Sequence, residues 1–448
     1  MSVSLAVADV RRIAHGPTRT MFIGLFLKSL ASGLTLSLIV LYLSTVRDFP
    51  ISVATALLAW QAVLTLGVSP LVGTLVDRSG PRPVLLVALL IEAISLFALG
   101  QVTTWQQALL VMSVVAVGGA GIWGPTDALL ARLVPSQDRS AAFGFQFMLL
   151  NLGIGLGGLI GATIIDIDRP STFELLYALN ALGFLAMFVA VLAMGDVGGL
   201  PVQDPGVGAD PDRSGGDDGS PGAAGPAPAD GWVTVLRDRN LRHYAAAALL
   251  MLTFGYGSID SGVALFITQF VGLDESRIGL VFAANTAVIV LVQLPMISFV
   301  RGRSRARMLA GVGTMWALTW VLFASALPLP GWLALGAVLL AMSAFAVGET
   351  LWSPVAPALL NDLAPEHLRG RYNAFQSLMW GVSGTLGPLI TGLFLSADLG
   401  GTWALTLAVG CLLAALLALR LRRHLTPGQD GLGDSEESPD DDPDPARP

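Results

Sequence analysis

The chain has 448 residues, of which 54% are hydrophobic and only 13% are charged, and its mean hydropathy is +0.69. Soluble domains carry about a quarter charged residues, so this composition excludes an ordinary soluble protein and favours one that crosses a membrane many times. The net charge of −7 is unevenly distributed along the chain. Residues 197–230 carry −5 and residues 429–448 carry −7, which leaves +5 on the remainder.

Apolar runs follow one another along the chain, each long enough for a transmembrane helix, which needs about 20 mostly apolar residues. No small-residue cleavage site follows the first run, so it is interpreted as a retained span and not as a signal peptide. The twelve predicted spans are 20–43, 51–72, 83–101, 106–131, 142–165, 173–195, 242–266, 276–299, 307–327, 332–358, 372–396 and 401–420.

Two acidic segments interrupt and end this pattern. Both are rich in Gly, Pro and Asp and contain too few apolar residues to form a core. The sequence therefore predicts an all-α membrane protein with an N-terminal six-helix half (1–196), a disordered acidic linker (197–231), a C-terminal six-helix half (232–425) and a disordered acidic tail (426–448).

Basic residues gather on one side of the predicted spans. Cytoplasmic loops carry the excess of Arg and Lys, so we expect both termini and the linker to be cytoplasmic and the protein to lie in the cell membrane. The residues on the predicted cytoplasmic side are Arg11, Arg12, Arg19, Arg78, Arg82, Arg132, Arg139, Arg237, Arg239, Arg242, Arg301, Arg303, Arg305, Arg307, Arg369, Arg371, Arg420, Arg422 and Arg423. The other side has only Arg47, Arg169 and Arg277.

The two halves resemble each other in sequence. Residues that recur at an offset of 230 are Pro135, Arg139, Phe145 and Gln146, which match Pro365, Arg369, Phe375 and Gln376. Trp123-Gly124-Pro125 similarly matches Trp352-Ser353-Pro354, and Gly157-Gly158 falls opposite Gly387-Pro388. A repeat of this spacing predicts two structurally equivalent six-helix halves. The arginine-rich run 301–307 of the second half is interpreted as a topology anchor.

A charged loop lies between the second and third apolar runs. It reads Gly73-x-Leu75-x-Asp77-Arg78-x-Gly80-x-Arg82 and resembles the signature loop of the major facilitator superfamily of secondary transporters. The resemblance implies two six-helix halves in parallel repeat, with a substrate bound between them near the membrane midplane.

It also implies that Gly73, Asp77, Arg78, Gly80 and Arg82 form a conformational latch that holds neighbouring helix ends in one state and releases them in the other. A charged loop that only sets topology is the alternative. One position departs from the family pattern, because Arg132 stands where an acidic partner is common.

Ionisable side chains occur inside four predicted spans. An ionised group at the bilayer centre costs about 2.5–3.5 kcal/mol or more, so it usually faces a cavity or a partner. By resemblance to the family, helices 1, 4, 7 and 10 line the central cavity, and each holds one such group. The predicted pathway for substrate and protons is therefore Lys28, Asp127, Asp260 and Glu349.

A different role is expected for each of these four residues. Glu349 is the candidate proton-coupling group, because a buried carboxyl gains proton affinity, with a hydrogen-bonded structural role as the alternative. Lys28 binds a substrate or an ion partner, or its side chain extends back toward the cytoplasm. Asp260 lies near an outer helix end, where it could simply be hydrated, and Asp127 is a latch partner or a helix-end charge. Glu92 is expected to be paired or interfacial.

Small residues recur every fourth position along the fifth span, at Gly153, Gly157 and Gly161. This spacing lets two membrane helices approach closely. The run resembles the antiporter motif of the family without its Pro and final Gly, and the eleventh span holds Gly387 and Pro388 at the related place. Helix packing and an antiport role both remain open. The Arg of many drug exporters in helix 4 is absent, since Val115 occupies that place.

The sequence favours a secondary active transporter that exports drug-like or secondary-metabolite compounds in exchange for protons. An importer or uniporter of a polar metabolite is the alternative, and a non-transporting membrane receptor is the alternative from another class. The lone lysine follows Leu27, so no P-loop is present, and no catalytic set or metal-ligand spacing occurs. We expect no enzyme activity, no cofactor, no nucleic-acid partner and a monomer in the lipid bilayer.

Overall fold

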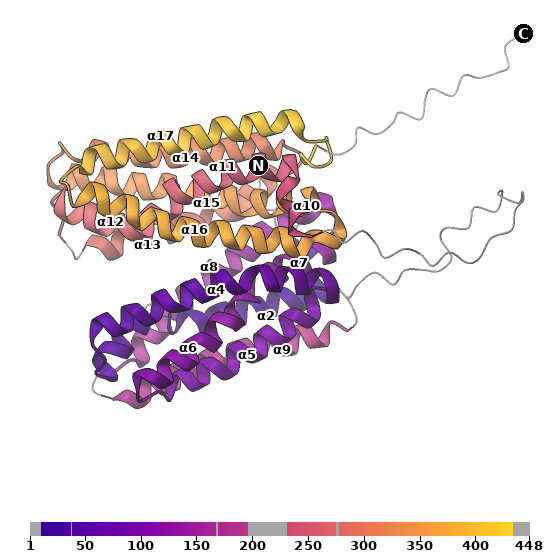
Figure 1. The fold of residues 1–448 in the computed structure, drawn as a ribbon. Helices are drawn as coiled ribbons and strands as arrows, with labels where there is room; N and C mark the ends of the chain where they lie inside the picture. The colour runs from indigo at the N-terminus through magenta and orange to yellow at the C-terminus, as the bar shows by residue number, and fades with distance from the viewer. Residues whose placement is uncertain (1–9, 37, 167–168, 196–230, 275–276, 433–448) are drawn as a thin grey trace, which may run out of the picture.

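The structure is a computed structural model that describes residues 10–36, 38–166, 169–195, 231–274 and 277–432. Within these ranges the chain is helical and forms no strand. The helices form two bundles that lie side by side, the N-terminal half in indigo to magenta and the C-terminal half in crimson through orange to yellow (Figure 1). The predicted all-α architecture of two helical halves is confirmed.

The N-terminal half contains α2 (Gly16–Gly33), α3 (Ile39–Leu41), a π-turn (Tyr42–Val46), α4 (Ile51–Ser79), α5 (Pro81–Gly100), α6 (Trp105–Ala120), α7 (Trp123–Leu133), α8 (Arg139–Ile164) and α9 (Pro170–Ala193). The C-terminal half contains α10 (Trp232–Arg237), α11 (Arg239–Met251), a π-turn (Leu252–Tyr256), α12 (Gly257–Gln269), α13 (Ile278–Val300), α14 (Arg305–Ala326), α15 (Gly331–Leu363), α16 (Arg369–Leu395) and α17 (Gly400–Leu421). Short 3₁₀ turns are Ser136–Asp138, Glu366–Leu368 and Arg422–His424.

The structure tests the predicted count of twelve spans only over the residues that it describes. Among the described residues, 10 helices are long and apolar enough to cross a membrane, and the count rises to 11 if the bent pair Arg239–Ile259 and Gly262–Gln269 is one span. The pair bends by 51°. The first predicted span, 20–43, is divided because α2 ends at Gly33 and the chain continues as the short α3. The count of twelve therefore stays a prediction.

Local sequence signals explain several helix boundaries. Gly80 ends α4 with φ of 85°, a conformation that glycine adopts without a steric penalty. Pro81 then opens α5, because its fixed φ suits the first helical position. Thr104 and Gln107 form a capping box at the start of α6. Asp238 caps α11 by accepting a hydrogen bond of 2.8 Å from the Asn240 N–H.

Each half has its own apolar core. The C-terminal core is built around fully buried Trp316, Trp320 and Trp403, and the N-terminal core around Tyr42 and Phe173. Large apolar side chains also cover the outside of the bundles, a pattern that suits contact with lipid.

The two acidic segments lie largely outside the described residues, namely 196–230 and 433–448. The first residues of the predicted tail are described and form a packed turn. Asp430 is only 3% exposed, and its side chain accepts a 2.9 Å hydrogen bond from the Ala306 N–H. Disorder was therefore wrongly predicted for 426–432, because one buried acid ties this stretch to the start of α14.

The small-residue stripe of α8 packs against α2. A Cβ atom added at Gly153 would lie 2.8 Å from the Leu30 backbone nitrogen, and one at Gly161 would lie 2.8 Å from the Leu34 carbonyl oxygen. At Gly157 it would lie 3.0 Å from the Gly33 Cα. The same relation occurs in the second half, where a Cβ at Gly387 would lie 2.7 Å from the Gly257 Cα. Pro388 lies inside α16, immediately after this contact. In both halves these residues bring two helix backbones together.

Gly157→Ala is expected to lower the melting temperature of the purified protein by about 5 °C, because overpacking against an unyielding backbone costs about 1–3 kcal/mol. Gly155→Ala is the matched control on the same helix, since nothing lies within 4 Å of a Cβ added there. The comparison is made by thermal denaturation in one detergent. Equal melting temperatures for the two variants would contradict the packing role of the stripe.

Candidate functional site

Asp77 joins the end of α4 to the beginning of α16. Its carboxylate accepts a hydrogen bond of 2.6 Å from the Gly370 N–H and one of 3.3 Å from the Arg371 N–H. The Arg371 guanidinium also lies 3.1 Å from the carboxylate, and both side chains are nearly buried. The positive end of a helix favours a negative charge at this place. One acid of the N-terminal half is therefore held by the backbone and side chain of the C-terminal half.

Two glycines of the loop motif make this approach possible. A Cβ added at Gly73 would lie 2.9 Å from the Gly370 carbonyl oxygen, so a side chain there would separate α4 from α16. Gly80 supplies the positive φ that ends α4 three residues after Asp77.

The described contacts of the two arginines of the loop differ from those of Asp77. Arg78 is exposed, and no ion pair connects it to the described residues. Arg82 donates hydrogen bonds to the carbonyl oxygens of Val191 and Leu192 at the end of α9, in its own half. The structure thus brings Gly73 and Asp77 to the contact between halves and places Arg78 and Arg82 elsewhere.

A second polar junction lies at the same end of the bundle and is centred on Asp362, at the end of α15. Asp362 pairs with Arg139 of the N-terminal half and with Arg305 of its own half. The Ser136 hydroxyl donates a 2.9 Å hydrogen bond to the same carboxylate. All three charged side chains are at most 10% exposed. We call the contacts of Asp77 and Asp362 the inter-half junction, and the end of the bundle that carries it the Asp77 end.

The sequence interpretation missed Asp362, Arg371 and Arg305. Arg305 was interpreted as part of a topology anchor, yet its side chain is 3% exposed and binds Asp362. A signal for Asp362 existed, because the offset of 230 between the halves places it opposite Arg132. The repeat therefore places charges of opposite sign at equivalent positions of the two halves.

Lys28 of α2 is buried in the N-terminal half. Its ammonium lies 4.8 Å from the ring centre of Trp123 and 5.5 Å from that of Phe184, within the range of cation–π attraction. Glu92 of α5 supplies an opposite charge that acts on it. Both side chains are less than 10% exposed. Lys28 is therefore buried among aromatic rings of its own half, with Glu92 close enough to act on it electrostatically.

Asp127 of α7 accepts a hydrogen bond of 2.9 Å from the Gln146 side chain of α8. The repeat counterpart of Gln146 is Gln376, whose side chain accepts a 2.8 Å hydrogen bond from the Tyr244 hydroxyl. The two glutamines thus hold equivalent positions and each binds a polar group of its own half. Asp127 contacts Gln146 and not the Asp77 loop.

Glu349 lies in the middle of α15, 6% exposed, and accepts a 2.6 Å hydrogen bond from the Asn285 side chain of α13. Its neighbour Gly348 allows close approach of Trp316, whose indole N–H donates to the Phe345 carbonyl oxygen at 3.2 Å. Trp316 also packs on Trp352 and Tyr256. Glu349 is therefore a carboxyl group beside an aromatic cluster in the C-terminal half.

The remaining predicted residue, Asp260, belongs to α12, but its side chain lies outside the described part of the structure. Within the described ranges, no group of three or more His, Cys, Asp or Glu side chains could hold a metal ion.

Comparison with known proteins identifies the family. The Major Facilitator Superfamily model matches residues 21–353 and, again, residues 246–443. The chain belongs to the major facilitator superfamily. It is therefore a multi-pass membrane transporter and not an enzyme.

Relatives by sequence are transporters of this superfamily. An uncharacterized MFS-type transporter, YhjO of Bacillus subtilis (strain 168), is 25% identical over 408 residues, which cover 90% of this chain and 92% of the relative. The multidrug resistance protein MdtH of Aeromonas hydrophila is 24% identical over 72% of this chain and 73% of its own length. The quinolone resistance protein NorA of Staphylococcus aureus is 28% identical over 39% of this chain and 44% of its own length.

Solved structures share the fold. A bacterial homologue of the iron transporter ferroportin, described as outward-facing, has a TM-score of 0.72 at 14% identity and covers 91% of this chain and 100% of its own. The human organic anion transporter MFSD10 has a TM-score of 0.63 at 17% identity, with 90% of this chain and 98% of its own covered.

Proposed function

We propose that the chain works by alternating access as a proton-coupled exporter of small amphipathic compounds, with the Asp77 end facing the cytoplasm. The observation that carries alternating access is the inter-half junction. Asp77 and Asp362 join the halves at one end through hydrogen bonds and ion pairs that can break without disturbing either apolar core. With this junction closed, a pathway between the halves opens on the outer side.

Glu349 supports proton coupling. It is an acid buried within a span, which costs several kcal/mol when ionised unless it is paired or hydrated. Asn285 gives it one hydrogen bond. Such a group can accept a proton in one state of the transporter and release it in the other.

Two observations support the proposed direction of transport, namely the names of the relatives and the distribution of arginines between the two ends of the bundle. MdtH and NorA are named for multidrug and quinolone resistance, which is consistent with export. Arginines are concentrated at the Asp77 end, as expected for the cytoplasmic side.

The test is proton release from inverted membrane vesicles that contain the full chain, challenged with a panel of cationic, neutral and anionic compounds. We expect an amphipathic compound to trigger proton release from acidified vesicles. Vesicles without the protein give the baseline. Transport without proton movement would indicate a uniporter, and neither transport nor proton movement for any compound would favour a receptor.

Asp77→Asn is expected to slow transport roughly tenfold and to increase opening at the Asp77 end, because the ion pair with Arg371 is lost. A spin-label pair, one label on each half at that end, measures the opening. Arg78→Gln is the matched control, since Arg78 is exposed and lies next in the chain. Equal effects of the two substitutions on both measurements would contradict the assignment of the junction to Asp77.

A further inference from the structure

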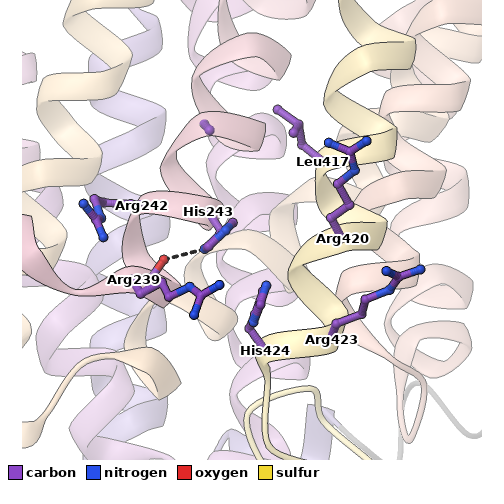
Figure 2. A pocket seen from close by; sticks show the side chains of 8 residues that line it. Arg239, Arg242, His243, Leu417, Arg420, Arg423 and His424 are labelled. Atoms are coloured by element: carbon purple, nitrogen blue, oxygen red, sulfur yellow. Dashed lines mark hydrogen bonds between the residues drawn. The ribbon is translucent and has the colours of Figure 1, made fainter.

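A basic cavity lies on the side of the C-terminal half, at the Asp77 end, between α11 and α17. Its volume is about 560 Å³. Arg239, Arg242, His243 and Ala246 line it from one face of α11, at helical spacings of three and four residues. The other wall holds Leu417, Arg420, Arg423 and His424. Figure 2 shows the arginines around two histidines at the centre.

The centre of this cavity is a pair of stacked imidazoles. The ring centres of His243 and His424 lie 4.6 Å apart, and the His243 Nδ1 is 2.7 Å from the Arg239 carbonyl oxygen (Figure 2). The Asn240 side chain donates a 3.3 Å hydrogen bond to the His424 carbonyl oxygen, which ties α11 to the end of α17. All four arginines are exposed at the surface, and the contacts between α11 and the end of α17 hold the two walls of the cavity together.

Four arginines converge here without carboxylate partners in the part of the chain that the structure describes. The nearby acids are engaged elsewhere: Asp238 accepts hydrogen bonds from the α11 N-terminus and the Tyr372 hydroxyl, and Asp430 lies 3.7 Å from Arg422. Guanidinium groups present several donors in a plane and suit phosphate oxygens. The cavity therefore has the charge and the donors to bind a phosphate group.

The surface above the cavity is apolar. Leu416, Leu413 and Val409 are 56%, 51% and 55% exposed. They precede Arg420 on α17 at spacings of three and four residues, so they form one stripe that leads from the arginines toward the membrane core. A free phosphate would leave this stripe unused, whereas a lipid would place its headgroup among the arginines and an acyl chain along the stripe.

We propose that this cavity binds the headgroup of an anionic phospholipid in the leaflet at the Asp77 end. Basic pockets between membrane helices are suited to acidic lipid headgroups. The bound lipid bridges α11 and α17, the first and last long helices of the C-terminal half.

Native mass spectrometry of the full-length protein in detergent tests this inference, with phosphatidylglycerol and phosphatidylcholine of identical acyl chains as probes. We expect the first phosphatidylglycerol to bind at least tenfold more tightly than phosphatidylcholine. The variant Arg242→Gln/Arg420→Gln/Arg423→Gln is expected to lose this preference. The control Arg19→Gln/Arg237→Gln/Arg307→Gln removes the same charge from exposed positions at the same end and is expected to retain it.

Three outcomes would overturn the proposal. Equal loss in both triple variants would indicate general charge attraction. Tight binding of glycerol phosphate, which has no acyl chain, would assign the cavity to a soluble phosphate compound. The acidic residues of 433–448 are the second alternative occupant, so a variant in which amides replace them is also tested. Phosphatidylglycerol selectivity that appears only after this replacement would assign the cavity to the tail.

Discussion

Glu349→Gln is expected to abolish substrate-triggered proton release from inverted vesicles while substrate exchange continues. Glutamine keeps the size of the side chain and can still form a hydrogen bond with Asn285, but it cannot take up and release a proton at physiological pH. The carboxyl is 6% exposed in the middle of α15. We expect proton release to fall at least tenfold, to the baseline of vesicles without the protein.

Glu174→Gln is the matched control. Glu174 is a half-exposed carboxylate at the opposite end of the bundle, 3.1 Å from Arg47. This variant should release protons at the rate of the wild type, and both proteins should be present at equal levels in the vesicles. Wild-type proton release from the Glu349 variant would remove this residue from the coupling role.

The helices and their grouping into halves could be predicted because they depend on information that is local in the sequence. Hydropathy locates a span by its own residues, and the repeat at an offset of 230 relates the halves without any knowledge of contacts. The first span shows the limit of this reasoning, since hydropathy continues through 20–43 while α2 ends at Gly33. A helix end inside an apolar run depends on packing, and here Gly33 lies against α8.

The partners at the junction could not be predicted in the same way. Arg139 and Asp362 are 223 residues apart, and helical periodicity indicates the face of a residue but not the helix end that it meets. The Asp77 motif was recognised because its spacing is local. Its partner Arg371 has no local pattern that distinguishes it from the other arginines at that end. The stacked pair of His243 and His424 is likewise formed by residues from distant parts of the chain.

Asp362→Asn is expected to have the largest effect on stability. The Asp362 carboxylate forms ion pairs with the buried guanidinium groups of Arg139 and Arg305. Its replacement by a neutral amide leaves two buried positive charges without this negative partner. Removing one partner of a buried ion pair costs about 3–5 kcal/mol. We expect the melting temperature to fall by about 10 °C. Arg139→Gln should lower it less, because the pair of Asp362 with Arg305 stays intact within the C-terminal half.

The two substitutions separate stability from conformational change. When the halves separate, the ion pair between Arg139 and Asp362 must break, because the two residues belong to different halves. The pair between Arg305 and Asp362 can stay intact, because both residues belong to the C-terminal half. We therefore expect Arg139→Gln to open the Asp77 end in the spin-label measurement with a modest loss of stability, whereas Asp362→Asn changes both. Asp138→Asn, which disturbs a pair with Arg12 inside the N-terminal half at the same end, should leave the opening unchanged. If Asp138→Asn opened that end as much as Arg139→Gln does, the effect would come from lost charge in general, and Asp362 would not be the residue that joins the halves.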